Sequence, residues 1–107
     1  MSGIDDREKG FENKFAHDQE IEFKATARRN KLLGLWAAEL LGIEGQEAEA
    51  YAKSVIVADF EEAGDDDVFR KVRADLDAKG VDLSDHLLRK QMDDLMVTAR
   101  EQIRSQG

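Results

Sequence analysis

The 107-residue chain contains neither cysteine nor proline. Without cysteine it can form no disulfide bond and no thiolate metal site, which suits a reducing cytoplasm. Without proline, nothing in the sequence forces a break inside a helix. Hydrophobic runs are short, and none approaches the roughly 18 apolar residues that a membrane span needs. The first ten residues carry charges where a signal peptide has an apolar stretch, so we expect a cytoplasmic protein that does not insert into a membrane.

Basic residues are in the minority, with 16 lysines and arginines against 24 aspartates and glutamates and a net charge of −8. This balance argues against nucleic acid as a partner, because phosphate contacts need clustered lysine and arginine. It is compatible with a protein partner. The sequence has no glycine-rich phosphate loop and no nucleophile grouped with a base and an orienting residue. We therefore predict a protein that is not an enzyme and has no cofactor.

Glycines divide the chain into helix-length segments. Gly42, Gly64 and Gly80 stand where a glycine can end a helix, and apolar residues recur at spacings of three and four between them. This pattern predicts helices at about 18–41, 46–63, 67–79 and 83–105. Short connections favour antiparallel neighbours, so the predicted fold is all-α, a four-helix up-and-down bundle.

One face of each predicted helix is apolar and should form the core. In order along the chain, these faces contain Ala25, Leu32, Leu33, Trp36, Leu40 and Leu41; Ala48, Tyr51, Ala52, Val55, Ile56 and Phe60; Val68, Phe69, Val72 and Leu76; and Leu88, Met92, Leu95, Met96, Ala99 and Ile103. Gly34 interrupts the first face at a cost of about 1 kcal/mol relative to alanine. Close approach of a neighbouring helix would explain it.

Residues 1–19 do not fit the bundle pattern, because they are rich in charge and poor in apolar side chains. Ile4, Phe11 and Phe15 are spaced seven and four residues apart, which aligns them on one narrow face of a helix. In one interpretation, Phe11 and Phe15 extend the first helix back over the bundle. In the other, which the charge content favours, residues 1–19 are a flexible charged arm that is disordered in the free protein and folds on a partner. Residues 20–107 then form the bundle.

A basic cluster and an acidic cluster are the remaining candidates for binding sites. Arg28, Arg29 and Lys31 are interpreted first as a solvated face or a docking patch. A second hypothesis is that Arg28, Arg29 or Arg70, together with a helix N-terminus, binds a nucleotide between helices. The acidic run 65–67 lacks the glycine and terminal glutamate of a calcium loop, so we interpret it as a helix cap.

The two histidines are interpreted as surface residues. His17 and His86 lie far apart in the sequence and have no cysteine to complete a zinc site, so we predict no metal.

For the fourth helix, Asp82 or Ser84 is the expected N-cap.

Three stretches of the sequence resemble one small protein family. They are DDREKGF from Asp5, FENKFAHDQEIEFKATARRNKLLGLWAAELLG from Phe11, and AYAKSVIVADFEEAGDDDVFRKVRADL from Ala50. They are similar to the zeta subunit of the alphaproteobacterial F-type ATP synthase, an ATPase inhibitor family formerly described as a domain of unknown function. The resemblance runs from Asp5 to about Ile103. Its most specific motifs are RRNKLLGLWAAE and ADFEEAG.

The resemblance implies an inhibitor of ATP hydrolysis that reaches the inner membrane only through the synthase and is a monomer when free. Its arm would enter the catalytic head between an α and a β subunit, with γ as a further partner, and block rotation in the hydrolytic direction. The implied contact residues are Ile4, Asp5, Asp6, Arg7, Lys9, Phe11, Lys14 and Phe15. The alternative is a helical ligand-binding or assembly module with weak or no inhibitory activity.

Overall fold

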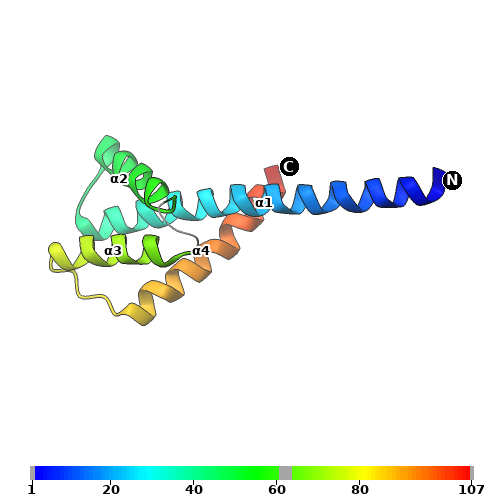
Figure 1. Ribbon diagram of the computed structural model, residues 1–107. Helices are drawn as coiled ribbons and strands as arrows, with labels where there is room; N and C mark the ends of the chain where they lie inside the picture. The colour runs from blue at the N-terminus through cyan, green and yellow to red at the C-terminus, as the bar shows by residue number, and fades with distance from the viewer. Residues whose placement is uncertain (1, 61–63, 107) are drawn as a thin grey trace.

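The computed structural model describes the backbone of residues 2–60 and 64–106, and the side chains of residues 18–60 and 64–106. These residues form four helices: α1 (Ser2–Leu41), α2 (Gly45–Ala58), α3 (Asp66–Ala78) and α4 (Asp85–Gln106). Successive helices run in alternating directions, and the described part of the chain contains no strand (Figure 1). The predicted all-α, four-helix up-and-down fold is confirmed. None of the described helices has both the length and the apolar character of a membrane span.

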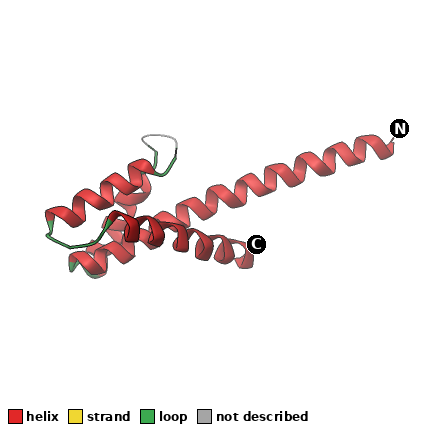
Figure 2. Cartoon of the chain, turned by 90° about the horizontal axis from the view of Figure 1, so that it is seen from below, coloured by secondary structure: helices red, strands yellow, loops and turns green. Residues whose placement is uncertain are grey.

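Helix α1 belongs to both the bundle and the arm. Its 40 residues make it about 60 Å long at about 1.5 Å per residue, which accounts for a molecule measuring 65 × 25 × 22 Å. The C-terminal half of α1 packs against the other helices, and its N-terminal part continues away from them (Figures 1 and 2).

The predicted start of the first helix at about residue 18 is wrong, because α1 begins at Ser2. The prediction treated the arm as a short isolated helix, which is marginal in water. A helix that continues an existing one needs no new nucleus and adds residues by propagation alone. The helix also runs away from the bundle rather than back over it (Figure 2). The disorder of the arm in the free protein stays a prediction.

The core lies where α1 meets the other three helices. Its buried side chains are Leu33, Ala37 and Leu41 of α1, Val55 of α2, Val68, Val72 and Leu76 of α3, and Leu88 and Met92 of α4. Most predicted core positions are buried or half-buried, and Trp36 packs half-buried against this cluster. The predicted place of Leu40 in the core is wrong, since its side chain is 39% exposed. Residues 33, 37 and 41 form the central line of the buried face, and Leu40 lies beside that line.

Helix α2 ends at Ala58, before the predicted end at about residue 63, and residues 61–63 lie outside the described part of the chain. The N–H groups of Asp59 and Phe60 donate to the carbonyls three residues earlier, at 3.2 and 3.1 Å, which tightens the last turn. Phe60 follows the helix and is 72% exposed. Its predicted place in the core is therefore wrong.

Glycines end α1 and α3 in the same way. Gly42 and Gly80 both have φ of +76°, and the N–H of the residue after each glycine donates at 2.9 Å to the carbonyl five residues earlier. The residues after the glycines, Ile43 and Val81, pack against the core. At the start of α4, Ser84 is the cap, because its Oγ accepts the N–H of Leu87 at 3.1 Å.

Gly34 lies at the contact between α1 and α2. A Cβ atom added at this position would lie 2.5 Å from the Cα of Ala52 and 3.0 Å from its Cβ. The expected close approach of a neighbouring helix is confirmed. Because the nearest atom belongs to the backbone of α2, the helices would have to separate before a side chain could fit.

We expect Gly34→Ala to lower the free energy of unfolding by about 1–3 kcal/mol, the usual cost of overpacking. The loss should appear in urea or thermal denaturation even though alanine favours a helix by about 1 kcal/mol. Gly10→Ala is the matched control, since it makes the same change in the part of α1 that projects from the bundle, and it should not lower stability. A Gly34→Ala protein as stable as the parent would contradict the close packing.

Candidate functional site

The arm residues implied by the family resemblance lie on the projecting part of α1. Its backbone is helical from Ser2 onward. The side chains of Ile4, Asp5, Asp6, Arg7, Lys9, Phe11, Lys14 and Phe15 lie outside the described residues. The described surface of the molecule therefore begins at Asp18, at the base of the arm.

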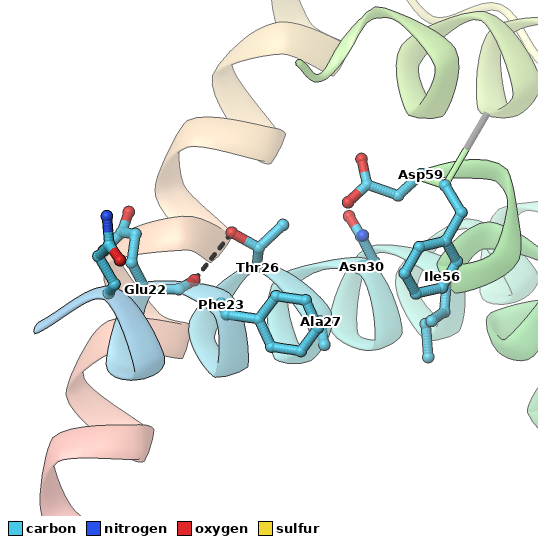
Figure 3. A pocket seen from close by; sticks show the side chains of 9 residues that line it. Glu22, Phe23, Thr26, Ala27, Asn30, Ile56 and Asp59 are labelled. Carbon is cyan, nitrogen blue, oxygen red and sulfur yellow. Dashed lines mark hydrogen bonds between the residues drawn. The ribbon is translucent and has the colours of Figure 1, made fainter. Parts of the chain in front are cut away.

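An apolar hollow opens at the base of the arm, between α1 and the end of α2. It has a volume of about 390 Å³ and is lined by Gln19, Glu22, Phe23, Thr26, Ala27, Asn30, Ile56, Asp59 and Phe60. Figure 3 shows Phe23 and Asn30 on α1 and Ile56 and Asp59 at the end of α2 around this space. Phe23 is 67% exposed and Phe60 is 72% exposed. Two exposed aromatic rings beside one hollow are typical of a binding surface.

A second hollow adjoins the first and shares three of its lining residues. Phe23, Ala27 and Ile56 line it together with Lys24, Arg28, Lys31, Ile103 and Gln106. The apolar ridge made by Phe23, Ala27 and Ile56 therefore separates an acidic side from a basic side. Glu22 and Asp59 lie on the acidic side, and Lys24, Arg28 and Lys31 lie on the basic side. We call the surface made by Phe23, Ala27, Ile56 and the neighbouring Phe60 the Phe23 ridge.

Arg29 is buried, which the interpretation of residues 28, 29 and 31 as one basic face did not foresee. Only 2% of its side chain is exposed. Its Nε donates to Oδ1 of Asn30 at 2.7 Å, and its Nη2 donates to Oδ1 of Asp65 at 2.9 Å. The hydrogen bond from Arg29 holds the pKa of the Asp65 carboxyl below its ordinary value. Arg29 thus ties α1 to the start of α3 instead of facing solvent.

The acidic run 65–67 forms ion pairs rather than side-chain caps. Asp65 occupies the N-cap position of α3, but its side chain makes no capping hydrogen bond. Asp66 accepts a hydrogen bond from Arg89 of α4 at 3.0 Å, and the Arg89 guanidinium also lies 3.9 Å from the centre of the Phe69 ring. Asp67 pairs with Arg70 one turn along α3. The run therefore stands at the predicted helix start, with Asp65 at the N-cap position, but its carboxylates bind arginines instead of making a side-chain capping hydrogen bond.

The three arginines of the nucleotide hypothesis are not brought together. Arg28 donates to Gln102 and Gln106 of α4, Arg29 faces Asp65, and Arg70 pairs with Asp67. Arg28 and Arg29 line different hollows. The described residues therefore do not form one pocket that uses all three guanidinium groups.

His86 is exposed at the start of α4, and the side chain of His17 lies outside the described residues. Among the described side chains, no group of three histidine or acidic residues is placed to hold a metal ion.

The comparison with protein families matches almost the full length of the chain. A family model described as ATPase inhibitor subunit zeta matches residues 1–102. The chain belongs to this family. The match includes the arm as well as the bundle, and it confirms the resemblance found from the motifs. Membership in the zeta family implies a regulatory rather than a catalytic protein, and an ATP synthase as its partner.

A solved structure supports the same fold. A protein whose structure was determined by solution NMR shares 50% sequence identity with this zeta-family chain and has a TM-score of 0.72. The similarity covers 81% of this chain and 99% of that chain. No curated protein sequence matches the chain.

The buried Arg29 generates a test of how this zeta-family chain holds α3. We expect Asp65→Asn to lower the free energy of unfolding near pH 7 by about 1–3 kcal/mol, because a buried guanidinium loses its anionic partner. The pKa of Asp65 is depressed in the folded state. Its contribution is therefore present above the unfolded-state pKa of about 3.9 and is lost as pH falls through the folded-state value. Urea denaturation of parent and variant should show a stability difference that disappears on acidification.

Asp66→Asn is the matched control for this experiment. It removes the neighbouring carboxylate, whose pair with Arg89 is exposed on both sides, at 70% and 46%. Exposed pairs contribute up to about 1 kcal/mol, so the loss should be smaller. Equal losses from the two substitutions would mean that the buried pair of Arg29 and Asp65 contributes no more to the free energy of unfolding than the exposed pair of Arg89 and Asp66.

Proposed function

We propose that this chain inhibits ATP hydrolysis by the F-type ATP synthase, with its arm inserting as a helix at a catalytic interface between an α and a β subunit of the head. The observation that carries the proposal is the family match, which extends over the arm from residue 1. The continuation of α1 beyond the bundle supports it, because this part of the helix lies away from the other three (Figure 1). A helix wedged into an interface that must open and close during turnover would stop the hydrolytic cycle.

The apolar residues of the arm are not enough for tight binding by themselves. Ile4, Phe11 and Phe15 share a helical face, and burying them contributes about 2 kcal/mol each, or about 6 kcal/mol together. Micromolar affinity requires about 8 kcal/mol, in addition to the cost of ordering the arm. Further contacts must supply the difference. The charged residues Asp5, Asp6, Arg7, Lys9 and Lys14 are the proposed polar contacts of the arm.

The Phe23 ridge is the proposed second contact with the same enzyme. Phe23 follows Phe15 by eight residues on one helix, a distance of about 12 Å. A large enzyme that takes up the arm therefore lies close to Phe23 and to the neighbouring Phe60. Both rings are mostly exposed in the free chain, so their burial would add binding energy without disturbing the core.

Hydrolysis of ATP by the cognate synthase tests the proposed function directly. The assay compares the full-length protein with a form that lacks residues 1–19. The proposal requires that the full-length protein inhibits hydrolysis and that the shortened protein does not. Inhibition by the shortened protein at the same concentrations would locate the inhibitory element in the bundle.

The apolar face of the arm can be tested separately. We expect a protein with both Phe11→Ala and Phe15→Ala to bind the synthase roughly a thousandfold more weakly, since about 4 kcal/mol of apolar burial is lost. The measurement is inhibition of ATP hydrolysis over a concentration series. The melting temperature should stay close to that of the parent if these rings contact only the enzyme. A large fall in melting temperature with unchanged inhibition would instead assign both phenylalanines to the core.

The proposed second contact predicts a smaller effect. We expect the combination of Phe23→Ser and Phe60→Ser to weaken inhibition at least about tenfold, because each buried aromatic anchor at an interface contributes more than about 1 kcal/mol. Stability should change little, because both rings are largely exposed. The matched control combines Leu87→Ser with Val97→Ser, two exposed apolar residues of α4 that are 51% and 54% exposed. If both double variants inhibit equally well, the Phe23 ridge is not a contact.

A further inference from the structure

The last two turns of α4 cross α1 at the base of the arm. Figure 1 shows the end of α4 crossing α1, which then continues alone toward the N-terminus. At this crossing both helices carry a fully buried alanine, Ala25 of α1 and Ala99 of α4. Alanine buries little apolar area, so hydrophobic contact alone gives this crossing less support than the leucine- and valine-rich core receives.

Polar side chains join the two helices at the crossing. Arg100 of α4 donates to the Glu22 carboxylate of α1, from Nη2 to Oε1 at 2.6 Å and from Nε to both oxygens at 3.2 Å. Arg28 of α1 donates from Nη1 to Oε1 of Gln102 at 2.9 Å and from Nη2 to Oε1 of Gln106 at 3.4 Å. We call these five residues the α1–α4 clamp.

The clamp lies at the base of the arm, next to the first residues from which the arm helix extends. A helix is costly to nucleate, and residues added to an existing helix cost much less. With Glu22 held against α4, the helical turn around it is already formed, and the arm can extend from it by propagation. A clamped turn also fixes the direction in which the arm leaves the bundle. Both effects reduce the ordering cost that the arm incurs when it binds a partner.

We propose that the α1–α4 clamp positions the arm, by holding the helical turn at Glu22 from which the arm helix grows. The inference rests on the proposed inhibitory function, because it assigns Arg100 and Arg28 the task of preparing the arm for the synthase. Arg100 acts without touching the enzyme, whereas Arg28 also lines the basic side of the Phe23 ridge, so a loss of inhibition in Arg28→Gln counts for the clamp only when the arm shifts fall as well. The clamp acts on inhibition through the helicity and direction of residues 1–21.

The test uses the full-length protein with Arg100→Gln and two readouts. The first is the helicity of residues 5–21 in the free protein, from ¹³Cα secondary chemical shifts. The second is inhibition of ATP hydrolysis by the synthase. We expect lower helical shifts in this segment and about a twofold to fivefold loss of inhibitory potency, the range for a largely exposed ion pair. Arg28→Gln removes the other half of the clamp and should act in the same direction.

Lys90→Gln is the matched control, because Lys90 forms an exposed pair with Asp94 at 3.4 Å within α4 and does not reach α1. It should leave both readouts at the parent values. The charge swap Glu22→Arg with Arg100→Glu should recover part of the lost helicity and inhibition, which loss of an unrelated property of Arg100 would not allow.

The proposal is overturned if Arg100→Gln and Arg28→Gln both leave the arm shifts and the inhibition unchanged, while deletion of residues 1–19 abolishes inhibition. A different result would refute the proposed inhibitory role of the arm. If the protein without residues 1–19 inhibits as well as the parent, the arm is not the inhibitor. The chemical shifts of the free protein then still show whether the clamp supports the arm helix.

Discussion

The close approach of α2 to α1 at Gly34 is the constraint on which the rest of the bundle depends. The Cα of Ala52 lies only 2.5 Å from the position that a Cβ atom at residue 34 would take, so the two helix backbones are in direct contact at this point. This contact brings Val55 into the same buried cluster as Leu33. Helices α3 and α4 complete that cluster with medium-sized apolar side chains. A larger residue at position 34 would force the helices apart and leave gaps that a close-packed interior does not tolerate.

Sequence periodicity predicted the centre of each buried face and failed at the edges. Leu33, Val72 and Leu88 are fully buried, because an apolar stripe at helical spacing must face the core in any bundle. Leu40 lies beside the central line of its face and Phe60 lies beyond the end of its helix, and both are exposed. The spacing of apolar residues does not show where a helix stops, so helix ends were the least accurate part of the prediction.

The candidate site was less predictable, because it depends on residues that are far apart in the sequence. Arg29 resembled its basic neighbours on the chain, and only the fold brings Asp65 within 2.9 Å of it. The Phe23 ridge requires the end of α2 to lie beside α1, which no local pattern encodes. The arm residues were assigned through the family resemblance instead. Their proposed contacts would be made with a partner surface that this chain does not contain.

The change in cross-section along the molecule has a mechanical consequence. The chain is a single helix of about 10–12 Å at one end and a bundle within overall dimensions of 25 × 22 Å at the other. If the arm inserts as proposed, a cleft just wide enough for one helix would admit the first part of α1 and exclude the bundle, which would act as a collar that stops further entry. The edge of this collar lies near Glu22, where α4 reaches α1. The roughly 20 residues before it span about 30 Å, and in the proposed insertion that length would set the greatest depth of entry.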